Sequence, residues 1–327
     1  MSAPEGDSTR VVIAALAGNL LIAISKFAAA FLSGSAATLA EAVHSVADTV
    51  NQVLLMLGLR RAARPPTLLH PFGHAVESYF WPFLVSIMIF LLGGAFAIYE
   101  GIEGLHHLLS GHPAEEHGSL LWSYGVLGLS FAFEAYSFSV AWGEFRKMMA
   151  GRTVWQTLMH AKDPTIPVVL MEDSAALLGL GIALIAVTLT DVTGWIGFDA
   201  IGSLLIGIVL AAVAYVLSRR THSLLLGESA TVEDRARVHE IARTVPGILE
   251  VTQLMSMHLG PKHVLLALKV GFDRQLGIEQ IETAIDAYEQ AIREAMPHMR
   301  YIFVEPDHDY VVEKDPERPR PVRGHTA

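Results

Sequence analysis

Residues 36–59, AATLAEAVHSVADTVNQVLLMLGL, form a largely apolar run that is long enough to cross a bilayer but carries ionisable side chains near its middle. His44 and Asp48 are four residues apart, so on a helix they lie on one face, one turn from each other. An imidazole nitrogen and a carboxylate oxygen at this spacing can bind one divalent metal ion. The alternative is a hydrogen-bonded pair that only holds two helices together. Because ionisable groups inside a membrane are costly and usually functional, the metal-binding interpretation is favoured.

The composition of the whole chain is typical of a polytopic membrane protein. Of its 327 residues, 52% are hydrophobic and 17% are charged, whereas soluble globular domains have roughly 25% charged residues. The mean hydropathy is +0.42. The formal net charge of −10 does not favour nucleic-acid binding, and the absence of cysteine excludes disulfides and thiolate metal sites. The first apolar run follows ten polar residues without a small-residue cleavage site, so we expect a transmembrane helix rather than a signal peptide.

Six apolar runs reach the length of about 20 residues that crosses the hydrocarbon layer. They are residues 11–33, 36–59, 79–98, 119–142, 166–188 and 195–217. Lysine and arginine gather after the second, fourth and sixth runs, at Arg60, Arg61, Arg64, Arg146, Lys147, Arg152, Lys162, Arg219 and Arg220. By the positive-inside rule these segments and both termini are cytoplasmic. We therefore expect an α-helical polytopic membrane protein, with a cytoplasmic N-terminus at residues 1–10 and six transmembrane helices within residues 11–220.

The C-terminal part has the pattern of a small cytoplasmic α+β domain at residues 221–312. An amphipathic helix is expected at residues 231–244, and a hairpin signal separates two β-prone runs at 249–259 and 263–272. Apolar residues then recur at helical spacing from Ile278 to Ile292, before a short strand at 300–305. The order α-β-β-α-β predicts a ferredoxin-like domain. The Pro- and Arg-rich tail, residues 313–327, is expected to be disordered.

The fifth apolar run carries two adjacent acids, Glu172 and Asp173. Adjacent residues lie about 100° apart on a helix, so both cannot point squarely at one site. The alternative is that this segment still lies among lipid headgroups, since Asp163 and Pro164 mark the preceding loop. The apolar residues 166–171 lie between that loop and the two acids, which favours a position inside the membrane.

These features together resemble the cation diffusion facilitator family of zinc and manganese exporters over nearly the whole chain. The resemblance is closest to the branch of the animal mitochondrial zinc transporter and its bacterial relatives. The residues that carry it are Gly34-Ser35, His44-x-x-x-Asp48, His70-Pro-Phe-Gly-His74-x-x-Glu77, Asp163-Pro-Thr, Glu172-Asp173-Ser-Ala-Ala and the C-terminal domain.

The family implies a transport site with four metal ligands, two on the second helix and a His-x-x-x-Asp pair on the fifth. His44, Asp48 and Asp173 match three of these positions, but the fourth falls on Val169, which cannot bind a metal. Glu172 is a candidate replacement, and water is its competitor. A metal-ligand set with one imidazole and two or three carboxylates is rich in hard oxygen ligands. It therefore tolerates manganese or iron better than a ligand set with two imidazoles does.

The expected function is a secondary active transporter that exports zinc or a similar divalent cation in exchange for protons by alternating access. Metal binding needs neutral imidazole and ionised carboxylates, so binding and proton release are linked. The alternatives are a manganese, iron or cobalt exporter and a membrane metal sensor. A metal-dependent hydrolase would need a signature such as His-Glu-x-x-His, which no span contains, so we expect no enzymatic activity.

The expected cargo is Zn2+, Mn2+, Fe2+ or Co2+, and no resident cofactor is expected. The expected partners are the metal ion, protons, the lipid bilayer and a second copy bound through the C-terminal domain, with no nucleic acid. We expect an integral protein of a bacterial inner membrane.

Several further polar residues are candidates for supporting roles. In the family, His70 and His74 can hold a second metal ion in the loop before the third helix; the alternative is a tight turn. Glu77 and Glu134 are candidates for the cation pathway or a proton relay. Lys26 is expected to snorkel toward the outer membrane surface. Two further groups of residues have the composition of metal sites: His106, His107, His112, Glu115, Glu116 and His117 in an extracytoplasmic loop, and His258, His263, Glu305, Asp307, His308 and Asp309 in the C-terminal domain. Solvated surface positions are expected for both groups, and metal binding is the alternative.

Overall fold

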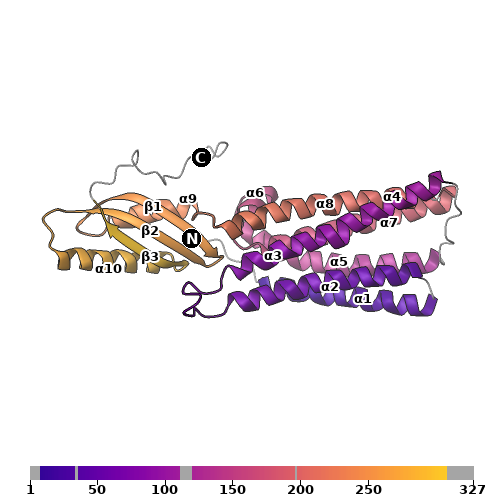
Figure 1. The fold of residues 1–327 in the computed structure, drawn as a ribbon, viewed down its shortest axis with the longest axis horizontal. Coiled ribbons are helices and arrows are strands. Elements are labelled where there is room, and N and C mark those ends of the chain that lie inside the picture. The colour runs from indigo at the N-terminus through magenta and orange to yellow at the C-terminus, as the bar shows by residue number, and fades with distance from the viewer. Residues whose placement is uncertain (1–7, 34–35, 111–119, 196, 308–327) are drawn as a thin grey trace. The chain divides into compact units, whose positions relative to one another are not determined.

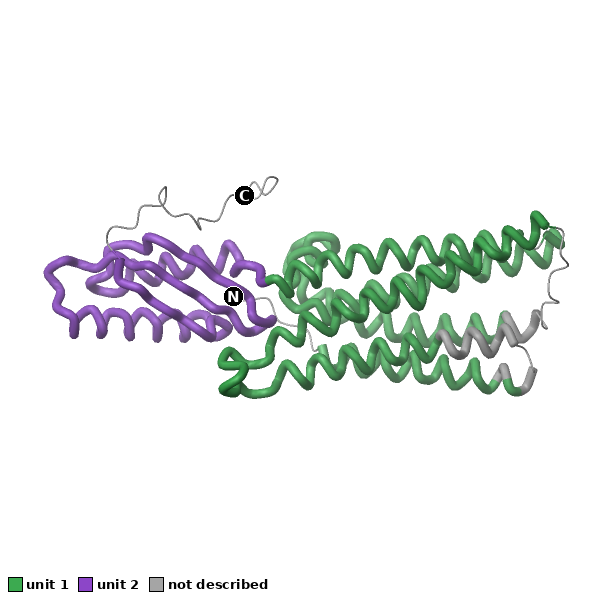
Figure 2. The backbone as a smooth tube through the Cα atoms, viewed as in Figure 1, with its two compact units in different colours: residues 1–226 green, residues 227–327 purple. Residues whose placement is uncertain are grey.

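The computed structural model describes residues 8–33, 36–110, 120–195 and 197–307. The chain divides into two compact units, Met1–Leu226 and Gly227–Ala327 (Figure 2). The first is helical and the second is mixed (Figure 1). The tail 313–327, for which disorder was predicted, lies outside the described residues.

The first unit consists of long helices and one short helix. Its elements are α1 (Ser8–Ser33), α2 (Ala36–Ala62), α3 (Glu77–Met88), the π-helix η1 (Ile89–Ala95), α4 (Phe96–Leu109), α5 (Leu120–Met149), α6 (Val154–His160), α7 (Thr165–Thr193) and α8 (Gly197–Leu226). Elements α3, η1 and α4 follow one another without a break, so they form a single helical rod from residue 77 to residue 109. This rod is longer than the predicted run 79–98. The break between α7 and α8 falls at Gly194, whose φ of +69° is the left-handed conformation that commonly ends a helix.

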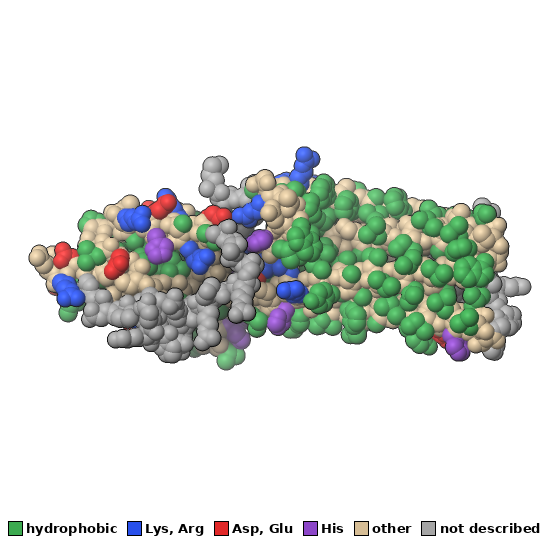
Figure 3. Space-filling view, turned by 90° about the horizontal axis from the view of Figure 1, so that it is seen from above, with side chains coloured by type: hydrophobic (Ala, Val, Ile, Leu, Met, Phe, Trp, Pro, Cys, Tyr) green, Lys and Arg blue, Asp and Glu red, His purple; other side chains and the backbone are tan. Residues whose placement is uncertain are grey.

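Hydrophobic side chains are spread along the whole length of the helical unit on the face seen in Figure 3, with few charged ones among them. Phe31, Val192 and Tyr215 are among the exposed apolar residues of the helical unit. Within the described residues, four helical segments are long and apolar enough to cross a membrane: Ser8–Ala28, Glu77–Leu109, Thr165–Thr193 and Gly197–Leu226. This is fewer than the six predicted spans, because the described parts of α2 and α5 contain more polar and charged side chains. The unit is a helical transmembrane domain.

Rod α3–η1–α4 packs very closely against α8. Gly101 of α4 is buried, and a Cβ atom placed on it would lie 2.8 Å from the backbone nitrogen of Leu204 and 2.9 Å from the carbonyl oxygen of Ala200. Gly207 of α8 is equally close to Ile98 and Gly94. The two backbones approach this closely because these positions have no side chain.

The second unit contains α9 (Val232–Ala242), β1 (Ile248–Gly260), β2 (His263–Phe272), α10 (Ile278–Ala295) and β3 (Met299–Pro306). The three strands form one sheet in the order β1-β2-β3. Strands β1 and β2 are antiparallel, and β2 and β3 are parallel. Alternate residues of β2, from Val264 to Val270, are buried in the core. Tyr288 of α10 is fully buried and donates a hydrogen bond of 3.0 Å to the carbonyl oxygen of Val238, which ties α10 to α9.

Candidate functional site

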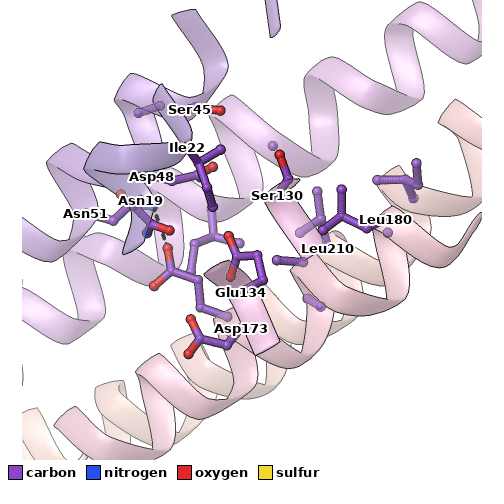
Figure 4. A pocket seen from close by; sticks show the side chains of 18 of the residues that line it. Asn19, Ile22, Ser45, Asp48, Asn51, Ser130, Glu134, Asp173, Leu180 and Leu210 are labelled. Atoms are coloured by element: carbon purple, nitrogen blue, oxygen red, sulfur yellow. Dashed lines mark hydrogen bonds between the residues drawn. The ribbon is translucent and has the colours of Figure 1, made fainter. Parts of the chain in front are cut away.

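A cavity of about 220 Å³ lies among the helices of the first unit, with walls from α1, α2, α3, η1, α5, α7 and α8. Four acidic residues from three helices line it: Asp48 of α2, Glu134 of α5, and Glu172 and Asp173 of α7. Figure 4 shows Asp48, Glu134 and Asp173 reaching this space from separate helices. The remaining lining is mainly apolar, so the cavity gathers four carboxyl groups in a weakly polar environment.

Asp173 is held in place by α5. Its side chain is 1% exposed, and its carboxylate accepts a hydrogen bond of 2.7 Å from the hydroxyl of Ser137. Ser137 lies 36 residues away in the chain, one helical turn after Glu134. The sequence did not single out Ser137, since serine is common in membrane helices and its partner lies on another helix. This bond fixes one carboxylate oxygen of Asp173, a residue that also lines the cavity.

Glu172 is held by α2. Asn51 donates a hydrogen bond of 3.1 Å to one carboxylate oxygen of Glu172, and Gln52 donates one of 2.8 Å to the other. All three side chains are largely or fully buried. Each oxygen of Glu172 therefore has a carboxamide donor, and the two bonds join α2 to α7. Asn51 and Gln52 follow Asp48 by three and four residues, so on a helix both lie near the face that carries Asp48. Two polar side chains at this spacing within an apolar run are the sequence feature that could have indicated this contact.

Glu134 and Lys26 line the same cavity. Glu134 is 7% exposed and comes from the middle of α5. Helix α1 packs on α2 and α5, and Lys26 is a half-buried part of the cavity wall. The apolar run of α1 does not reveal which of its faces packs inward.

The structure brings Asp48, Glu134, Glu172 and Asp173 to one cavity but not into one coordination shell. Among the side chains that the structure describes, no three His, Asp or Glu residues lie close enough to hold a metal ion together. His44 belongs to α2, but its side chain lies outside the described set. Val169, at the position where the family resemblance places a fourth ligand, is fully buried in an apolar cluster with Ile166 and Val168.

The loop before α3 brings two imidazoles together. The ring centroids of His70 and His74 are 4.6 Å apart. Gly73 between them has a φ of +80° and donates a hydrogen bond to the carbonyl oxygen of His70, which makes the segment a tight turn. Nδ1 of His74 is buried and has no hydrogen-bond partner among the described residues. Glu77, three residues further on, accepts a hydrogen bond from the indole of Trp81, so its carboxylate is engaged outside the cavity.

The remaining candidates are not among the residues that line this cavity. His106 and His107 lie in the last turn of α4, with ring centroids 6.4 Å apart. Glu305 and Asp307 pair with Lys269. Burial and the charge of Arg300 lower the pKa of His263, so its imidazole is neutral at physiological pH. His258 is buried in the sheet rather than on the surface, which corrects the prediction for that residue. His112, Glu115, Glu116, His117, His308 and Asp309 lie outside the described residues.

Comparison with known protein families identifies the class. Residues 12–226 match the family model described as the cation efflux transmembrane domain, and residues 230–309 match the cation efflux protein, cytoplasmic domain. The chain therefore belongs to the cation efflux family, also called the cation diffusion facilitators, and the predicted membership is confirmed. The family consists of membrane efflux proteins rather than enzymes.

Individual relatives support this membership. Over 266 residues the chain is 36% identical to the proton-coupled zinc antiporter SLC30A9, mitochondrial, of Xenopus laevis, an alignment that covers 81% of this chain and 46% of that protein. It is 32% identical over 295 residues to metal tolerance protein C4 of Arabidopsis thaliana, an alignment that covers 89% of this chain and 63% of that protein. It is 25% identical over 293 residues to the cation-efflux pump FieF of Escherichia coli, and this alignment covers 88% of this chain and 89% of the pump. The chain spans about half the length of the SLC30A9 relatives that it matches.

Proposed function

We propose that this chain is a secondary active transporter that exports a divalent cation, zinc or an ion of similar size, from the cytoplasm in exchange for protons. The observation that carries the proposal is the buried cavity where acids from α2, α5 and α7 meet. Several carboxylates in an apolar membrane domain repel one another and lose hydration, and a divalent cation offsets both costs.

In this proposal Asp48 and Asp173 bind the cation together with His44, and Glu172 or a water molecule supplies a further ligand. Rocking of the helices exposes the site to one side of the membrane and then to the other. Among the described side chains no three His, Asp or Glu residues lie close enough to hold a metal ion together, so the proposal assigns binding to a conformation in which α2 and α7 bring these groups together.

Proton coupling follows from the chemistry of the ligands. The cation binds neutral imidazole and ionised carboxylates, so protons compete for the same groups. An ordinary histidine pKa near 6.5 places this competition close to neutral pH. Protons that enter from the outer side therefore expel the cation, and the inward proton gradient drives export.

The proposed membrane arrangement has six spans within residues 11–220, cytoplasmic termini and a location in a bacterial inner membrane. The cytoplasmic domain, residues 221–312, is proposed to be ferredoxin-like and to hold two copies of the chain together. The similarity of residues 230–309 to the cytoplasmic domain of cation efflux proteins supports this role.

Transport by the purified chain in sealed vesicles tests the function. With a pH gradient imposed, we expect uptake of Zn2+ accompanied by proton counterflow, and competition by Mn2+, Fe2+ and Co2+ ranks the ions. His44→Ala should abolish both fluxes, because the nitrogen ligand is lost. If His44→Ala left pH-driven uptake and metal-induced proton flux intact, the proposed mechanism would be wrong. Metal binding without any counterflow would favour the sensor alternative.

A second, more exposed metal site is proposed in the loop at His70 and His74, since their rings already lie side by side. Replacing both imidazoles by alanine should lower the stoichiometry of Zn2+ binding by one ion per chain, measured by calorimetry on the purified protein. Replacing the solvent-exposed His160 of α6 is the matched control and should leave the stoichiometry unchanged. An equal stoichiometry in the double variant and the native chain would dismiss the loop site.

A further inference from the structure

Asn51 and Gln52 form a matched pair with one difference. Both carboxamides are buried, with exposed fractions of 3% and 0%, and both donate a hydrogen bond to Glu172. Asn51 also lines the cavity, beside Asp48 and Asp173, whereas Gln52 is not among the lining residues. Figure 4 shows Asn51 on the same helix as Asp48, at the edge of the cavity. The two residues thus share one contact and differ in access to the site.

The bond to Glu172 determines which way the Asn51 amide faces. Asn51 donates this hydrogen bond through Nδ2, so its NH2 group faces Glu172. Its carbonyl oxygen, Oδ1, is then directed away from Glu172. This oxygen is buried and has no hydrogen-bond partner among the described residues. A buried acceptor without a partner is uncommon in folded proteins, and one beside a cavity indicates a ligand.

The chemistry of this oxygen suits a divalent cation. Carboxamide and carboxylate oxygens are hard ligands that bind Mn2+, Mg2+ and Ca2+ well, whereas imidazole also suits Zn2+. Asn51 follows Asp48 by three residues, a spacing that places the two side chains on one face of α2. The fourth ligand position of the family resemblance, Val169, lies in the apolar core. Among the described buried oxygens without a hydrogen-bond partner, Oδ1 of Asn51 and Oγ of Ser130 belong to residues that line the cavity. Of these two, only Asn51 lies on the helix that carries Asp48.

We infer that the carboxamide oxygen of Asn51 binds the transported cation directly, and that Glu172 serves as the anchor that orients it. The inference rests on the proposed function and specifies its site: three oxygen ligands, from Asp48, Asn51 and Asp173, with the imidazole of His44. Gln52 supports Glu172 from the other side but does not touch the ion. This oxygen-rich set favours manganese over zinc relative to a site with two imidazoles.

Direct ligation can be tested with Cd2+ because the chain contains no cysteine. Thiolate is a soft ligand for Cd2+, and a cadmium–thiolate bond adds an ultraviolet charge-transfer band that the native protein lacks. In the purified full-length protein, Asn51→Cys should develop this band on titration with Cd2+, and Gln52→Cys should not. Absence of the band in Asn51→Cys, or an equal band in both variants, would overturn the inference.

Ion selectivity is the second measurement, and it does not depend on the cysteine variants folding. In vesicles, Asn51→Ala should lower the ratio of Mn2+ to Zn2+ uptake by about 10-fold, the effect typical of a lost contact at a metal site. Gln52→Ala removes the same kind of bond to Glu172 and should reduce uptake of both ions without changing their ratio. Equal changes of the ratio in both variants would mean that Asn51 acts only through Glu172.

The two levels of the proposal can fail separately. Native protein that moves no divalent cation in vesicles would overturn the proposed function. The cadmium band measures binding rather than transport, so it still decides whether position 51 contacts a cation bound in the cavity.

Discussion

Asp173→Asn is expected to lower divalent-cation uptake into vesicles by more than about 100-fold. Loss of a group that only supports a metal ligand already reduces affinity or activity by 10- to 100-fold, and loss of the charged ligand itself should cost more. The amide has the shape of the carboxylate and still accepts a hydrogen bond from Ser137, so the helices remain packed. What is lost is the negative charge that offsets the charge of the cation. Uptake rates and Zn2+ or Mn2+ affinity by calorimetry measure the effect.

The matched control is Asp199→Asn. Asp199 is an exposed acid in the first turn of α8, outside the cavity, and its replacement should leave uptake within about two-fold of the native rate, as expected for a surface position. The thermal unfolding midpoints of the two variants should agree. Native-like affinity in Asp173→Asn would show that this carboxylate does not bind the cargo, and the cavity would then need another explanation.

Gly101→Ala is expected to destabilise the transmembrane domain by about 3 kcal/mol, the upper range for overpacking in a filled core. The added methyl group would lie 2.8 Å from the backbone nitrogen of Leu204, 2.9 Å from the carbonyl oxygen of Ala200 and 3.0 Å from the Cα atom of Leu204. All three are backbone atoms, so no side chain can turn away. Helices α4 and α8 must separate, and the packing around them is lost. Thermal unfolding in detergent, followed by circular dichroism, measures the change.

Gly128→Ala in α5 is the corresponding control. Nothing lies within 4 Å of a Cβ atom at this exposed helical position, and alanine is favoured over glycine in helices by up to about 1 kcal/mol. The thermal unfolding midpoint of Gly128→Ala should equal or slightly exceed that of the native protein. If Gly101→Ala were as stable as Gly128→Ala, the close contact between α4 and α8 would not be a feature of the protein in its membrane.

Buried hydrogen bonds around the cavity have a consequence for transport. Ser137 joins α5 to α7 through Asp173, and Asn51 and Gln52 join α2 to α7 through Glu172. A rocking movement that preserves these bonds moves α2, α5 and α7 as one body. Close glycine contacts join α8 to α4 at Gly101 and Gly207, and to α7 at Gly202, where an added Cβ atom would lie 2.8 Å from the Cβ atom of Ala186.

Much of this arrangement follows from the sequence alone. Long apolar runs predict helices, because a chain in lipid must satisfy its backbone hydrogen bonds internally. The alternation of β2 and the helical spacing of α10 predict the elements of the cytoplasmic unit, since each buries one face. Asp48, Glu134 and Asp173 stand out for a similar reason: an acid inside an apolar run is costly wherever it points. The composition of a segment and the spacing of its apolar residues are local properties, so both can be read from the sequence without coordinates.

Only the tertiary structure decides which of these groups meet. Glu172 contacts Asn51 and Gln52 across 121 and 120 residues of chain, and Lys26 lines the same cavity as Glu134. These outcomes depend on the rotation of each helix about its axis, which is determined by how all the helices pack together. A helix that is apolar on every side carries no signal for that rotation. The partners of its few polar residues are therefore a property of the assembled bundle.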